Sequence, residues 1–248
     1  MNWLKFFLIF SSFIFVQSTA ETVHNQYNYE CWRLGFFTLL FFCPLISQLI
    51  KFKKYKQAFS YQYLEDSLIK KVLKGGVIIL VILALIMSLS LVTFLIQLNE
   101  YFYIVLFIDI FVFHIIYKLS HNNFKSYVTE DGLKLVGAIT TNFINTSILI
   151  ISLITFDFLD VKHIDISPEL FRTINSEVCN GCYVFQDLLR TQRFFSDLTY
   201  AIKSQNLGFI GDAIFVFFYI TSLSIVPMTS ITLIYMYSIE KINNYNQL

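Results

Sequence analysis

The stretch KFKKYKQAFSYQYLEDSLIKKVLK, residues 51–74, decides how this chain folds. It carries seven lysines and lies between two apolar segments, Leu34–Ile50 and Gly75–Leu98. Lysines that flank apolar helices stay on the cytoplasmic side of a membrane, because the charged side chains do not readily follow a helix through lipid. The stretch therefore predicts a cytoplasmic loop between two membrane-spanning helices.

The composition of all 248 residues supports a membrane protein. Charged residues make up 14% of the chain, against about 25% in an ordinary soluble domain, and hydrophobic residues reach 56%. The lysines lie at the ends of apolar segments, so the sequence offers no basic domain for a direct nucleic-acid site. The predicted fold class is an all-α integral membrane protein.

Five apolar segments match a bilayer core of about 30 Å, which needs roughly 20 helical residues. They are Leu34–Ile50, Gly75–Leu98, Tyr101–Tyr117, Leu135–Phe156 and Leu207–Tyr237. The last is longer than the others, and Pro227 is expected to kink it, because proline removes a backbone donor. The sequence thus predicts five transmembrane helices, with residues 21–248 forming a single polytopic membrane domain.

Residues 1–20 resemble an export signal. Lys5 follows a short start, residues 4–16 supply an apolar core, and Ser18-Thr19-Ala20 offers small side chains at the cleavage positions. We expect a cleavable signal peptide, with a retained anchor as the alternative, and a mature chain that begins outside the cytoplasm at Glu21.

The remaining loops agree with this orientation. Residues 51–74, residues 118–134 and the tail after Tyr237 carry 7, 3 and 1 lysines, and all three lie inside if Glu21 lies outside. The C-terminus is therefore expected inside, and residues 157–206 form an extracytoplasmic loop. Anionic lipid is a predicted partner of the basic loop, because each basic residue near an anionic leaflet gains about 1 kcal/mol. The residues concerned are Lys51, Lys53, Lys54, Lys56, Lys70, Lys71 and Lys74.

Cys179 and Cys182 form a C-x-x-C motif in the outer loop. In an oxidising compartment the pair is expected to form a disulfide that staples the loop, and redox activity is the alternative. Cys31 also lies outside, so the pairing stays open. The outer histidines and cysteines do not make a zinc motif, and we expect no metal and no cofactor.

Asp109 is the candidate intramembrane polar site. A charge at mid-bilayer costs roughly 2.5–3.5 kcal/mol on insertion scales, so such residues often mark an ion path or a partner. A neutral aspartate that is hydrogen-bonded inside the bundle is the structural alternative. His114 points about 140° away from Asp109 on a helix, and Asp212 lies close enough to the outer surface to reach water.

Asn142 and Asn145 are predicted to be helix-packing residues. They lie about one turn apart in the fourth apolar segment, where amide side chains hydrogen-bond between helices. The chain has no phosphate-binding loop, nucleophile elbow or paired-carboxylate motif, which makes an enzyme the less favoured class.

The chain resembles one family in four consecutive features: the outer C-x-x-C, the Phe185 that follows it, an amphipathic stretch and a long glycine-containing span. They are similar to polytopic inner-membrane subunits of type IV secretion and conjugal transfer systems, over Cys179 to about Pro227, or roughly a fifth of the chain. The resemblance implies a non-enzymatic subunit of a multiprotein complex in a bacterial inner membrane, within the channel part of the apparatus, with other membrane subunits as partners.

Two alternatives remain open. The first is a membrane thiol oxidoreductase that uses the outer C-x-x-C; proteins of the DsbB type are similar in combining spans with outer cysteines, although they use two outer pairs. The second is an immunity protein against a pore-forming toxin, because such proteins are short, polytopic and poor in motifs.

Overall fold

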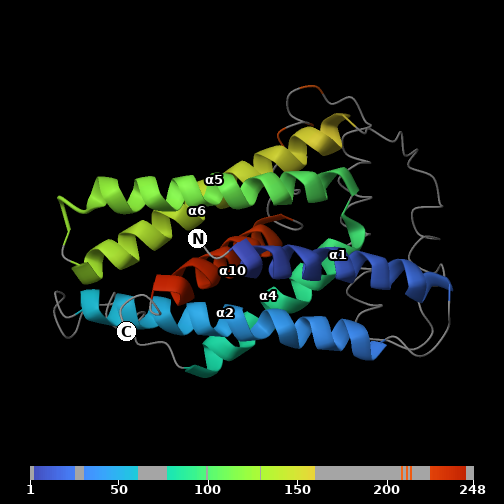
Figure 1. The fold of residues 1–248 in the computed structure, drawn as a ribbon, viewed down its shortest axis with the longest axis horizontal. Helices are drawn as coiled ribbons and strands as arrows, with labels where there is room; N and C mark the ends of the chain where they lie inside the picture. Colours follow the sequence, from blue (N-terminus) through green and yellow to red (C-terminus); the bar gives the residue numbers. More distant parts are fainter. Residues whose placement is uncertain are drawn as a thin grey trace.

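The computed structural model describes residues 3–25, 31–60, 77–98, 100–128, 130–159, 208, 211, 213 and 224–243. Within these ranges the chain is all-helical. The six helices are α1 (Trp3–Asn25), α2 (Cys31–Ser60), α4 (Val77–Gln97), α5 (Glu100–Phe124), α6 (Glu130–Leu159) and α10 (Ile225–Asn243). They pack as a bundle in which α6 packs against α5 and α4 packs against α2, each pair crossing at an angle (Figure 1).

Four helices are long and apolar enough to cross a membrane. The apolar stretches are Leu34–Lys56, Val77–Ile96, Tyr101–Phe124 and Gly132–Thr155. Each overlaps one of the first four segments predicted from the sequence, so the chain is an integral membrane protein. Large apolar side chains remain exposed along these helices, such as Ile78 at 75% and Phe143 at 74%, as expected for surfaces that face lipid rather than water.

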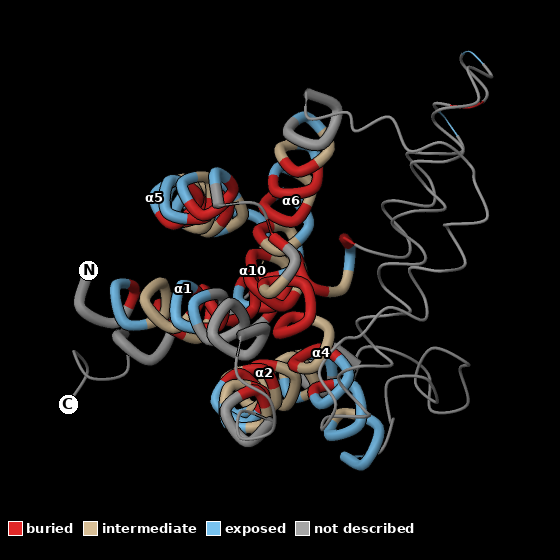
Figure 2. Tube along the Cα trace, turned by 90° about the vertical axis from the view of Figure 1, so that its right-hand side faces the viewer, coloured by how far each residue is buried: buried red, intermediate tan, exposed pale blue. Residues whose placement is uncertain are grey.

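The helix α10 occupies the centre of the bundle. It contacts each of the other five described helices, and Figure 2 shows its buried turns between α6 and α4. The hydroxyl of Tyr235, a fully buried residue of α10, donates to the carbonyl of Leu106 at 3.1 Å. The Tyr235 ring also lies 5.5 Å from the Phe113 ring, between centroids.

The helix α1 packs into the same core. Phe6, Phe13 and Val16 are buried, and the rings of Phe6 and Phe13 lie 6.2 and 6.5 Å from that of Tyr235, between centroids. The residues that resemble an export signal therefore form part of the bundle, while cleavage after Ala20 stays a prediction.

The described lysines of residues 31–159 gather at one end of the bundle, which we call the lysine end. There the C-terminal ends of α2 and α5 meet the N-terminal end of α6 (Figure 1). The lysine end is formed by Lys51, Lys53, Lys54, Lys56, Lys118, Lys125 and Lys134. Residues of two predicted cytoplasmic segments thus share one end, and the side of the membrane that this end faces stays a prediction.

One boundary differs from the sequence prediction. The helix α2 does not end at Ile50 but runs to Ser60, so the first part of the predicted loop 51–74 is helical. Lysine favours helices, and its long stem lets the ammonium group reach water from a helix that still borders lipid. Pro227 lies in the first turn of α10. Most of the predicted segment before Ser224 lies outside the described residues, so the kink stays a prediction.

Candidate functional site: a buried polar cluster

Asp109 lies inside the bundle on α5. Its side chain is 3% exposed, and its Oδ2 accepts a hydrogen bond from Nδ2 of Asn145 on α6 at 3.1 Å. The other carboxyl oxygen, Oδ1, has no hydrogen-bond partner among the described residues. One oxygen of the carboxyl group is therefore hydrogen-bonded, and the other has no described partner.

Asn145 joins three helices through its two amide hydrogens. One goes to Asp109 on α5, and the other goes to Oγ1 of Thr232 on α10 at 3.2 Å. The Thr232 hydroxyl donates to the carbonyl of Met228 at 3.0 Å, so its oxygen acts as the acceptor toward Asn145. The Thr146 hydroxyl lies 3.4 Å from the same oxygen and is the donor in that contact. The cluster Asp109, Asn145, Thr146 and Thr232 thus ties α5, α6 and α10 together.

This cluster contains more acceptors than donors. Both hydrogens of the Asn145 amide are used, and the Thr232 hydrogen is used as well. Within the cluster, Oδ1 of Asp109 and Oδ1 of Asn145 are buried without a partner among the described residues. The buried Thr141 hydroxyl, one turn from Asn145 on α6, also has no described partner, and it can donate as well as accept. An excess of buried acceptors in an apolar surrounding favours a proton, a water molecule or a small cation, because unpaired polar atoms are costly there.

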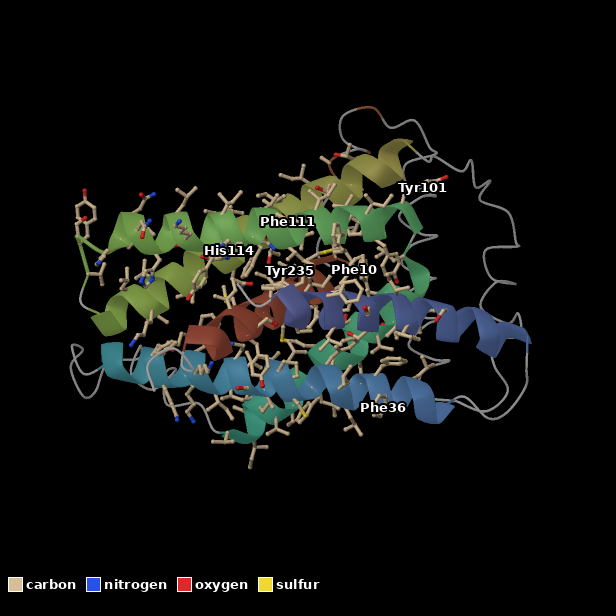
Figure 3. All side chains as sticks on the ribbon, viewed as in Figure 1. Phe10, Phe36, Tyr101, Phe111, His114 and Tyr235 are labelled. Atoms are coloured by element: carbon tan, nitrogen blue, oxygen red, sulfur yellow. The ribbon has the colours of Figure 1, made fainter. Side chains whose placement is uncertain are left out.

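Tyr235 lies on α10 three residues after Thr232, and its hydroxyl is committed to the Leu106 carbonyl, three residues before Asp109 on α5. Figure 3 shows Tyr235 in the middle of the bundle, whereas Tyr101 lies toward one end. The buried Tyr235 side chain thus connects α10 to the same stretch of α5 that the polar cluster joins.

The other predicted site residues that the structure describes do not join this cluster. Asn142 lies on α6 three residues before Asn145, but its Oδ1 is buried without a partner, and its side chain lines a groove on another face. His114 on α5 forms no hydrogen bond to Asp109, and its Nδ1 is also without a partner among the described residues. Cys179, Cys182 and Asp212 lie outside the described residues, as do Lys70, Lys71 and Lys74. Within the part that the structure describes, no three histidine, cysteine or acidic side chains group as metal ligands.

Sequence reasoning missed Thr232 and Thr146. Threonine is common in membrane helices, and a single hydroxyl does not mark a contact by itself. The only available signal was composition: Thr229, Ser230 and Thr232 follow Pro227 closely in an otherwise apolar helix.

Comparison of the chain with protein-family models, with curated proteins and with solved structures gave no significant match.

Proposed function

We propose that the chain is a non-enzymatic subunit of a membrane protein complex, to which its bundle contributes a polar site around Asp109. The observation that carries this proposal is the Asp109 carboxyl group, which Asn145 holds inside an apolar bundle while Oδ1 is left open. An ionisable residue at this depth is expensive, and two amides or hydroxyls would tie the same helices at lower cost. Its presence favours a role in a polar path over a purely structural role.

The specific complex that we propose is the inner-membrane channel part of a type IV secretion or conjugal transfer apparatus in a bacterial inner membrane. The support is the sequence resemblance over Cys179 to about Pro227, most of which lies outside the described residues. In this proposal Cys179 and Cys182 hold the outer loop together, and Asp109 provides a polar group within the membrane.

Site-specific photo-crosslinking in native membranes tests the proposal. A photoreactive amino acid is placed at one lipid-facing position on each of three helices, Ile78 on α4, Ile108 on α5 and Phe143 on α6, where the side chains are 75%, 54% and 74% exposed. A subunit of a complex is expected to crosslink to the same membrane protein from one face and not from the others. Equal, weak crosslinking from all three positions, with a monomeric protein after mild extraction, would contradict the proposal.

The type IV assignment has its own readout. The crosslinked partner is expected to be another subunit of that apparatus, and Asp109→Asn is expected to lower DNA transfer between cells while the bundle stays folded. Asparagine keeps an acceptor for Asn145 but removes the ionisable group. A partner from an unrelated complex would remove the type IV assignment and leave the subunit role in place.

A further inference from the structure

A second site lies on another face of the bundle, in a groove of about 700 Å³ between α4 and α6, with α10 and the end of α2 forming its base. Figure 2 shows α4 and α6 on either side of α10. The volume falls within the range of about 300–1,000 Å³ that is typical of ligand sites. The groove is therefore large enough for a ligand rather than for a few water molecules.

Each helix turns one regular face toward the groove. From α2 come Leu49, Phe52, Lys53 and Lys56, at the spacing i, i+3, i+4 and i+7. From α4 come Ile79, Leu80, Leu83, Ile86 and Met87, and from α10 come Ile225, Val226, Thr229 and Leu233. Residues at these spacings lie on one side of a helix, so the groove is built from the continuous faces of packed helices.

The groove has an apolar wall and a basic end. Its described lining is apolar except for Lys53, Lys56, Asn142 and Thr229. The two lysines lie in the part of α2 that forms the lysine end, while Met87 and Leu233 are buried at the base. Oδ1 of Asn142 is a buried acceptor without a partner among the described residues.

We propose that this groove binds one anionic phospholipid, with an acyl chain along the apolar wall and the phosphate at Lys53 and Lys56. A phospholipid joins a long apolar chain to a negatively charged headgroup, which matches an apolar groove with basic residues at one end only. The site is independent of the polar cluster and of the proposed subunit role.

Native mass spectrometry after detergent extraction tests the proposal, with phosphatidylglycerol and phosphatidylcholine as probes. The wild-type chain is expected to retain one phosphatidylglycerol in preference to phosphatidylcholine. The double substitution Lys53→Gln and Lys56→Gln is expected to weaken phosphatidylglycerol binding by about 25-fold, since each lysine near an anionic headgroup contributes about a factor of five. Leu83→Trp, which fills the groove from an exposed position on α4, is expected to reduce the binding of both lipids.

The matched control is the pair Lys54→Gln and Lys118→Gln. It removes the same charge from the same end of the bundle, but neither residue lines the groove. This control is expected to bind phosphatidylglycerol as the wild type does. The proposal is overturned if the control pair loses as much binding as the groove pair, or if Leu83→Trp has no effect. It is also overturned if the wild-type chain forms dimers that carry no lipid, because a second copy would then occupy the groove.

Discussion

Replacing Asn145 by alanine is the most direct perturbation of the buried cluster. The substitution removes the two hydrogen bonds to Asp109 and Thr232, of 3.1 and 3.2 Å. Side-chain hydrogen bonds inside membrane proteins contribute about 0.6 kcal/mol on average and about 1.7 kcal/mol at most. Two average bonds give about 1.2 kcal/mol, and the Asp109 carboxyl group also loses its only described donor, which adds to the cost. We expect the free energy of unfolding to fall by about 1–2 kcal/mol.

The neighbouring Asn142 provides the control. It is the same residue type on the same helix, but it forms no hydrogen bond among the described residues. Asn142→Ala is therefore expected to change the free energy of unfolding by less than about 0.5 kcal/mol. Both variants can be measured by reversible unfolding in bicelles or mixed detergent micelles.

A double-mutant cycle with Thr232→Val separates the contact from general damage to the packing. The coupling energy between positions 145 and 232 is expected to be about 0.6 kcal/mol, the value of one membrane hydrogen bond. A coupling near zero, or an equal loss of stability in Asn142→Ala and Asn145→Ala, would refute the assignment of Asn145 as the residue that joins α5, α6 and α10.

Three further predictions concern the core, the N-terminus and the orientation. Phe13→Ala is expected to lower the free energy of unfolding by about 3 kcal/mol, because the side chain is fully buried. Phe7→Ala, at a position that is 62% exposed, is expected to lower it by less than about 1 kcal/mol. Equal losses in the same unfolding assay would contradict the placement of α1. A chain that begins at Glu21 is expected to have a lower Tm in detergent than the full-length chain, and an unchanged Tm would show that α1 does not stabilise the bundle. The orientation is tested by single cysteines in a background without native cysteines. A membrane-impermeant thiol reagent is expected to label Lys54→Cys only from the cytoplasmic side and Tyr101→Cys only from the outside. Labelling of both positions from one side would contradict the predicted orientation.

The membrane-spanning segments were predictable because each depends on a local property. A run of about 20 apolar residues must cross the bilayer as a helix, whatever its neighbours are, so the segment Gly75–Leu98 could be placed almost to the residue, as α4 shows. The end of α2 was harder to place, because charge marks where a segment leaves the apolar core and not where its helix stops.

The contacts between helices were not predictable in the same way. Lipid is as apolar as leucine, so hydrophobicity does not show which face of a membrane helix meets another helix. Asp109 and Asn145 stood out as polar residues in apolar segments, but the sequence did not show that they contact each other across 36 positions. Thr232, a further 87 positions beyond Asn145, gave no signal of its own.

The central place of α10 has a consequence for biogenesis. The ribosome delivers this helix after the other five, yet all of them rest on it in the finished bundle. The earlier helices must therefore enter the membrane before α10 is present. Until then, lipid or the insertion machinery must cover the surfaces that later contact α10. A premature stop before Ser224 would remove the middle of the assembly rather than its rim, and the product would be a substrate for membrane proteases.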